Sequence, residues 1–438
     1  MPALRNHRLT IAVALVTAAM VATPATAAKF ISKKQVKKRY YTKKQADDRY
    51  PQRIELATSD GSAPNLGSNL VHWDVLAGVP AGFADGTDDT GEAAAPSWLL
   101  AGNAGTDPAT QFVGTTDDLA LNFRVNDLRA FRLEPDPTSP SVIGGFPGNN
   151  GSITGATIGG GGQDGAPNAV TADFGTVGGG QDNSVISVNA TVGGGIDNTA
   201  GGPGVGQGAT VGGGSENTAS GIGATIGGGG LNDATSTGST IGGGDQNTAS
   251  GGHSTVAGGR LNDATGQDST IAGGAAGTAS GGASTIGGGG SQTASGNQST
   301  IGGGQGNIAS GSLSNIDGGL FNTASGASST IGGGRDNVVT AQYGTISGGA
   351  PSNIMDTFNT RNIVTDEYGT IGGGGNNQAG DALGTTTDRT YATVGGGLQN
   401  TASEFRATVG GGHNNAATGD AAIVGGGVSN TASGPQAA

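Results

Sequence analysis

The stretch Ser239-Thr240-Ile241-Gly242-Gly243-Gly244-Asp245-Gln246-Asn247-Thr248-Ala249-Ser250-Gly251 decides the fold of this 438-residue chain. It is one copy of a repeat, because its Thr-Ile or Thr-Val pair returns every 15 residues from Thr210 to Thr345, with Asn315 replacing Thr once. Further copies begin at positions 142, 157, 176, 191, 370, 393, 408 and 423, so there are 18. A fixed period of this length predicts a solenoid.

Four positions of the unit carry the pattern, counted from the Thr as position one. The second is Ile or Val in all 18 copies, and the fourth is Gly in all 18. The tenth is usually Ala. The eighth is Asn in 14 copies, and the exceptions are Asp164, Gly277, Gln292 and Ser352.

These residue types predict one coil per unit, with two short strands in each coil. The β-branched pair forms a strand with Ile on one face and Thr on the other. The Gly run adopts positive φ and turns a first corner. Asn tolerates the left-handed region and is expected to turn a second corner. The fold class is therefore all-β, a parallel β-roll or β-solenoid.

Coils stacked about 4.8 Å apart place like residues above one another. We expect a Thr ladder outside, and inside a column that includes Ile226, Ile241, Val256, Ile271, Ile286, Ile301, Ile316, Ile331 and Ile346. We expect an Asn ladder at one corner that includes Asn217, Asn232, Asn247 and Asn262. One Ile or Val per coil is a thin core. Several chains packed side by side are therefore expected.

The start of the chain has the pattern of an export signal. Residues 1–27 contain two Arg, an apolar run and an Ala-Thr-Ala cleavage site, and the run is too short for a membrane-spanning anchor. Residues 28–55 are a basic segment that contains two tandem decamers, residues 31–40 and 41–50. They either dock on an anionic surface or form a solvated spacer.

Residues 56–95 form a Gly/Asp-rich linker, and residues 96–140 carry a β-hairpin pattern. Alternating apolar residues from Leu119 to Val125 predict a half-buried strand, and residues 128–133 predict its return. An open solenoid end needs a cap, and this hairpin unit is positioned to supply it. The β-roll then occupies 141–434, before a tail at 435–438.

Charge is divided sharply along the chain. Residues 1–55 hold 12 of the 20 Lys and Arg residues, whereas the rest has 8 Arg against 30 Asp and Glu. So acidic a body repels phosphate, which argues against nucleic acid as a partner.

Insertions lengthen four steps of the repeat, and such loops often carry binding in solenoids. The largest spans Ala350 to Glu367 and the other large one about Ala379 to Tyr391. The predicted contact residues in these two loops are Met355, Phe358, Arg361, Asp388, Arg389 and Tyr391.

The repeat resembles the head of YadA-type trimeric autotransporter adhesins in its small-β-branched strand, Gly corner and Ala-x-Gly return over residues 142–433. The resemblance implies a left-handed roll, a homotrimer, export to the cell surface and adhesion to a surface glycan, protein or cell wall. The coiled-coil stalk and membrane barrel of that family do not follow the roll in this sequence.

Other functions fit the residues less well. The chain has no Cys and no nucleophile paired with a base, so an enzyme is not predicted, and neither is a cofactor or metal. A calcium-binding solenoid of the nine-residue type is not predicted, because the repeat in this chain is 15 residues long. A structural or phage-like fibre and an ice-binding solenoid, suggested by the Thr ladder, stay open as alternatives.

Overall fold

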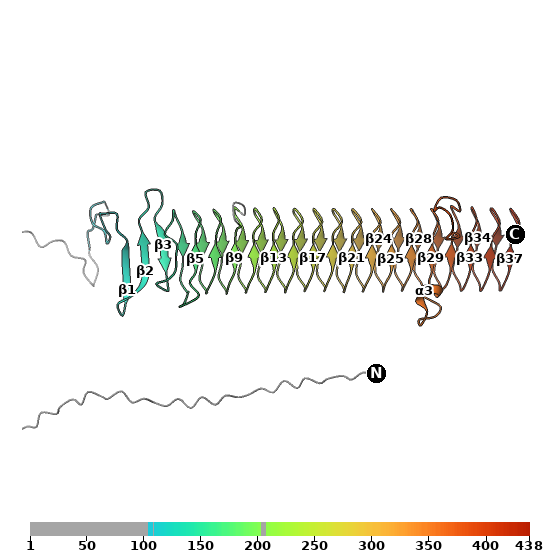
Figure 1. The fold of residues 1–438 in the computed structure, drawn as a ribbon, viewed down its shortest axis with the longest axis horizontal. Coiled ribbons are helices and arrows are strands. Elements are labelled where there is room, and N and C mark those ends of the chain that lie inside the picture. The colour runs from blue at the N-terminus through green and yellow to red at the C-terminus, as the bar shows by residue number, and fades with distance from the viewer. Residues whose placement is uncertain (1–103, 108, 203–206) are drawn as a thin grey trace, which may run out of the picture. The chain divides into compact units, whose positions relative to one another are not determined.

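The computed structural model describes residues 104–107, 109–202 and 207–438, and the account below concerns its compact unit Phe112–Ala438. The predicted signal, basic decamers and linker lie outside the described residues. From β3 onward, the unit is a parallel β-solenoid whose coils stack one above another, as Figure 1 shows.

Each regular coil contributes one two-residue strand to each of two parallel sheets. Sheet A contains the Thr-Ile pairs, and Thr240 and Ile241 lie in register with Thr255 and Val256 of the next coil. Sheet B contains the pairs that follow Asn, with Thr248 and Ala249 in register with the next coil in the same way. This confirms the predicted fold class.

Sheet A has 18 coil strands: β3 (Ser141–Gly144), β4 (Thr157–Ile158), β6 (Thr176–Val177), β8 (Thr191–Val192), β10 (Thr210–Val211), β12 (Thr225–Ile226), β14 (Thr240–Ile241), β16 (Thr255–Val256), β18 (Thr270–Ile271), β20 (Thr285–Ile286), β22 (Thr300–Ile301), β24 (Asn315–Ile316), β26 (Thr330–Ile331), β28 (Thr345–Ile346), β30 (Thr370–Ile371), β32 (Thr393–Val394), β34 (Thr408–Val409) and β36 (Ile423–Val424).

Sheet B has 17 strands: β5 (Ala169–Val170), β7 (Ser184–Val185), β9 (Thr199–Ala200), β11 (Thr218–Ala219), β13 (Asp233–Ala234), β15 (Thr248–Ala249), β17 (Asp263–Ala264), β19 (Thr278–Ala279), β21 (Thr293–Ala294), β23 (Ile308–Ala309), β25 (Thr323–Ala324), β27 (Val338–Val339), β29 (Ile363–Val364), β31 (Gln378–Ala379), β33 (Thr401–Ala402), β35 (Ala416–Ala417) and β37 (Thr431–Ala432).

The core lies between the two sheets and matches the prediction. The Ile and Val side chains of sheet A and the Ala side chains of sheet B are buried along the stack. The Ser or Ala that precedes most sheet A strands is also buried, as at Ser239 and Ala224. Outside, the Thr side chains of sheet A, such as Thr240, are mostly half-buried.

The Asn ladder is buried and runs along the first corner, between a sheet A strand and the following sheet B strand. The Nδ2 group of Asn247 donates to Oδ1 of Asn232 at 3.0 Å, to the carbonyl of Gly243 at 3.1 Å and to that of Gly259 at 3.0 Å. Its own Oδ1 accepts from the backbone N–H of Asn262 at 3.1 Å. Each ladder Asn therefore joins neighbouring coils at this corner, beside the backbone hydrogen bonds that Asp245 and Gln246 make to the adjacent coils.

The prediction that Asn itself adopts the left-handed conformation is wrong. Gly244, with φ +99°, and Gln246, with φ +56°, turn the first corner. A Cβ on Gly244 would lie 2.1 Å from the carbonyl oxygen of Gly259, so this position requires glycine. At the second corner, between sheet B and the next sheet A strand, His253 has φ +56°. Asn is selected for its buried amide and not for its backbone.

The ladder is more complete than the spacing suggested. Asn168 occupies the ladder in place of the predicted exception Asp164, and Asn362 in place of Ser352. In both coils the inserted residues come before the ladder position, so the ladder Asn is no longer the eighth residue of its unit. Among the described coils, Gly277 leaves a gap in the ladder, whereas Gln292 in the next coil replaces Asn in part, because its Oε1 accepts from the backbone N–H of Asn307.

A three-stranded antiparallel unit precedes the coils. β1 (Leu121–Val125) pairs with β2 (Leu128–Glu134), and β2 pairs with β3, which confirms the hairpin. β2 thereby covers the free edge of the first sheet A strand. The predicted half-buried face is more open than expected, because Phe123 and Val125 are 45% and 70% exposed.

Candidate functional site

The two large insertions leave the solenoid at opposite corners. The segment 351–361 projects from the first corner and contains the short helix α3 (Thr357–Thr360). The segment 381–391 projects from the second corner, after β31. Figure 1 shows α3 on one edge of the stack and the other loop on the opposite edge. The predicted boundary at Glu367 is wrong, because Ile363–Val364 is the regular strand β29.

The α3 loop is folded by its own polar contacts. The side chain of Asp356 caps α3 by accepting from the backbone N–H of Asn359 at 3.3 Å. Thr360 Oγ1 donates to the carbonyl of Asn353 at 3.0 Å, which closes the base of the loop. Of the predicted contact residues, Met355 is 90% exposed and Phe358 lies within α3.

A polar cavity of about 550 Å³ lies on sheet B beside α3. Ala382, at the start of the second loop, also lines it, so the cavity extends between the two insertions. Amide groups both donate and accept hydrogen bonds, which suits a hydroxyl-rich or peptide ligand. The polar lining residues are Asn359, Arg361, Asn376, Asn377, Gln378, Gln399, Thr401 and Asn414.

A row of aromatic side chains follows the second corner through the interrupted coils. The rings of Tyr343 and Tyr368 stack at 4.8 Å between centroids, and those of Tyr368 and Tyr391 stack at 4.8 Å as well. Phe405 meets Tyr391 edge-on at 6.3 Å, and the guanidinium of Arg406 lies over the Phe405 ring. The predicted contact residue Tyr391 is thus the centre of an exposed aromatic strip.

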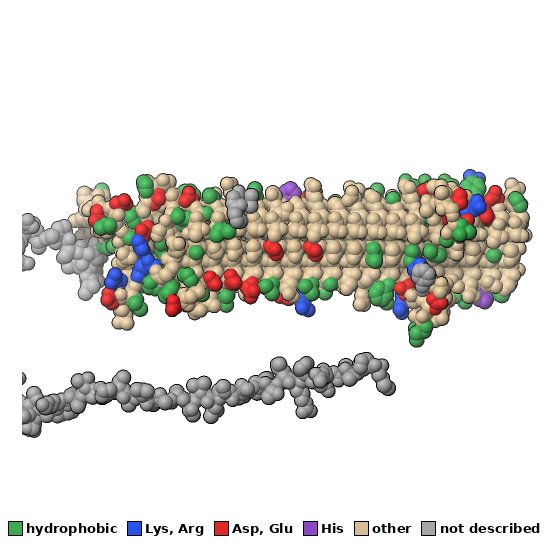
Figure 2. Space-filling model, viewed as in Figure 1, with side chains coloured by type: hydrophobic (Ala, Val, Ile, Leu, Met, Phe, Trp, Pro, Cys, Tyr) green, Lys and Arg blue, Asp and Glu red, His purple; other side chains and the backbone are tan. Residues whose placement is uncertain are grey.

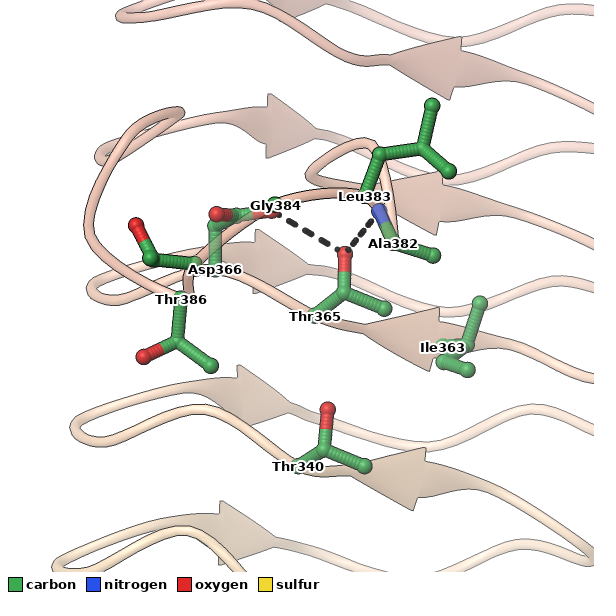
Figure 3. Close-up of a pocket in the computed structure, with 9 residues that line it drawn as sticks. Thr340, Ile363, Thr365, Asp366, Ala382, Leu383, Gly384 and Thr386 are labelled. Carbon is green, nitrogen blue, oxygen red and sulfur yellow. Dashed lines mark hydrogen bonds between the residues drawn. The ribbon is translucent and has the colours of Figure 1, made fainter.

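The second loop closes over a buried carboxylate. Asp366 is 1% exposed, and its Oδ2 accepts from the backbone N–H of Asp381 at 3.0 Å and from Thr365 Oγ1 at 3.1 Å. A cavity of about 310 Å³ lies here, between Thr365, Asp366 and the turn 382–386, as Figure 3 shows. Burial raises the pKa of Asp366 above its usual value, although hydrogen bonds to the carboxylate act in the opposite direction.

Arg389 is held by two acidic side chains. Its Nε lies 2.9 Å from Glu404 and 3.5 Å from Asp381, which ties the loop to the next coil. Asp388 is exposed, and one of its carboxylate oxygens comes within 4.8 Å of oxygens of Asp366 and Asp381. The predicted residues Asp388, Arg389 and Tyr391 therefore lie together, on the edge opposite to Met355 and Phe358.

Sequence reasoning missed Asp366, Tyr343 and Tyr368. The signal for the tyrosines was present, because Tyr343, Tyr368 and Tyr391 each stand two residues before a sheet A strand. Since every coil stacks in register, this shared position places them in one row.

Charged side chains are sparse over the central coils. Between Ser269 and Gly334 the one charged residue is Asp317. Figure 2 shows few charged side chains over the coils from about β17 to β25, and more over the coils with insertions. Charged side chains therefore gather toward both ends of the solenoid, over the hairpin unit and first coils as well as over the coils with loops.

Comparison with known proteins gives no family for this chain, because no family model matches it and no curated protein is detectably similar. Within the part of the chain described, no helix has the length and apolar character needed to cross a bilayer.

Proposed function

We propose that the chain is an exported, non-catalytic rod that works as a homotrimer and attaches to a surface, with its contact region on sheet B between the two large insertions. The central coils then act as a spacer. At about 4.8 Å per coil, 18 coils extend roughly 85 Å. This length separates the contact region from the N-terminal end of the rod.

The observation that carries the proposal is the polar cavity between the loops. Arg361 and Asn359 line this cavity on the α3 side, and Ala382 lines it on the side of the second loop. Elsewhere in the described coils sheet B presents mainly Thr, Ser and small side chains. The cavity offers amide donors and acceptors over several coils, which suits a glycan or an extended peptide.

The trimer is supported by the exposed apolar surface of the hairpin unit. Phe123, Val125 and Leu128 are 45%, 70% and 64% exposed, and Leu119 is 65% exposed. Apolar side chains grouped like this are typical of protein interfaces. The thin core, with one Ile or Val and small residues per coil, favours the same association.

The test uses the purified chain on arrays of glycans and extracellular-matrix proteins, with its oligomeric state measured by sedimentation. A variant lacking 351–360 returns the step from 345 to 370 to the 15-residue period. We expect it to remain folded and trimeric and to lose surface binding. A monomeric chain would overturn the trimer, and wild-type binding unchanged by the deletion would overturn the contact region. Failure to bind, with assembly into a larger particle, would favour the structural fibre.

Ice binding is the second candidate, and sheet B gives it a specific basis. Thr278 with Ser280, and Thr293 with Ser295, form paired outward columns along the stack. Asp233 and Asp263 interrupt these columns in nearby coils. Thermal hysteresis of the purified chain would establish this function, and its absence would remove it.

A further inference from the structure

The base of the second loop brings three carboxylates together. One oxygen each of Asp366, Asp381 and Asp388 lies within 4.8 Å of the others. Calcium takes roughly six to eight oxygen ligands and tolerates irregular geometry and bound water, so three such carboxylates can share one ion.

Asp366 supplies an independent observation. Its side chain is 1% exposed, and its Oδ1 has no hydrogen-bond partner although its Oδ2 has two. Figure 3 shows Asp366 among the residues that line the cavity under the loop. A buried carboxylate oxygen without a donor is unfavourable unless a cation balances it.

The backbone is shaped around this carboxylate. Gly380 has φ +98°, and a Cβ there would lie 2.1 Å from Asp366 Oδ2. Only glycine lets the chain pass so close to the carboxylate and still turn into the loop.

We propose that Asp366, Asp381 and Asp388 bind one Ca²⁺ ion. Asp366 follows strand β29 in the coil, whereas Asp381 and Asp388 belong to the loop, so the ion fastens the loop to the solenoid. Calcium fits because all three ligands are carboxylates, while zinc prefers nitrogen and sulfur and magnesium demands stricter geometry. Arg389 lies 3.5 Å from Asp381 and weakens its charge, but the 2.9 Å contact with Glu404 holds the guanidinium toward the next coil.

The experiment is calcium titration of the full chain after chelator treatment, followed by calorimetry and by terbium luminescence, with Tyr368 and Tyr391 as sensitisers. We expect one site per chain, with a dissociation constant on the order of 10⁻⁴ M, as in extracellular calcium modules. Asp366→Asn keeps the hydrogen-bond acceptor and removes the charge, and Asp388→Asn changes an exposed residue that does not threaten folding. Each is expected to weaken binding at least about tenfold.

Asp263→Asn is the matched control. Asp263 is also partly buried with an unpartnered Oδ1, but it has no carboxylate cluster around it. Binding unchanged in this variant and lost in the other two would support the site. The proposal is overturned by no calcium or terbium signal up to about 10 mM, well above the range of such modules. It is equally overturned by binding that survives both Asp366→Asn and Asp388→Asn.

Discussion

The coils of residues 210–349 and those of 350–409 share one interior and differ at their corners. In the first region nine consecutive steps keep the 15-residue period. In the second, two loops interrupt it, yet Asn362, Val364 and Ile371 occupy the same buried columns as before. The backbone pairing of β28 with β30 and of β27 with β29 continues beneath the loops.

The comparison teaches that the buried strands and the Asn ladder keep neighbouring coils in register, whereas the corners tolerate inserted residues. The strand pairs and the Asn ladder need only a few residues per coil. Many of the residues between them at a corner are exposed, so extra chain can leave there at a small cost in loop-closure entropy. Buried charge and stacked aromatics occur where the extra chain covers the coil.

The largest effect is expected from Asn247→Ala in the regular region. The substitution removes the donor for the carbonyls of Gly243 and Gly259 and the acceptor for the backbone N–H of Asn262. Unpaired buried groups each cost about 1–3 kcal/mol, so a loss of about 3 kcal/mol or more is expected in urea unfolding. Thr248→Ala, on the half-exposed face beside it, is the control and should cost far less. Equal losses would refute the ladder as the main support of the corner.

A smaller gain is expected from repairing the ladder at Gly277. A Cβ there meets Asn262 Oδ1 at 3.2 Å and otherwise has room, and φ is not in the left-handed region. Gly277→Asn is expected to stabilise the chain by about 1 kcal/mol, from restored hydrogen bonds and a less flexible unfolded chain. Thermal unfolding measures it. Gly273→Asn, with open space and no ladder neighbour, should give no such gain.

A pH-dependent effect is expected at Asp263, which stands at a sheet B position where Thr is the commonest residue. Burial raises its pKa, so the folded state disfavours the charged form. The Asp263 carboxyl therefore contributes most to folding stability below the pKa that it has in the unfolded chain. That contribution is lost as the pH rises through its raised pKa in the folded state. Asp263→Thr should therefore stabilise by about 1 kcal/mol at neutral pH, discounted for partial exposure, and the gain should vanish below about pH 4.

Asp317→Gly is the comparison for that pH series. Asp317 is exposed on the outer face of sheet A, where most coils have Gly. Its substitution should change stability little at any pH. A pH dependence as large as that of Asp263→Thr would mean that overall charge, and not burial, is responsible.

The smallest effect on stability is expected from deleting 351–360. The ladder contact from Asn362 to Asn337, at 3.0 Å, is already made below the loop. Stability should stay within about 1 kcal/mol of the full chain. A loss of several kcal/mol, in calorimetry, would show that the α3 loop is part of the core and would erase the distinction between the two regions.

The sequence predicted the interior well because identical positions must stack. Ile241 and Asn247 follow from the period alone. It predicted the corner backbone poorly, since residues as different as Gln246, His253 and Leu261 adopt the left-handed conformation there. It also could not reveal the environment of Asp366, which depends on how the second loop folds back over the coil.

The register of sheet A pairs each residue with its counterpart in the next coil, 15 positions on in the regular coils and further where a loop is inserted. The distance along the axis between the hairpin unit and the loops is therefore an integer count of coils. Loss or duplication of a whole unit in the gene would shorten or lengthen this reach by about 4.8 Å and leave both loops on the same edges. The length of the rod can thus change in evolution through the number of repeat units. The binding specificity of the loops can change separately, through substitutions within them.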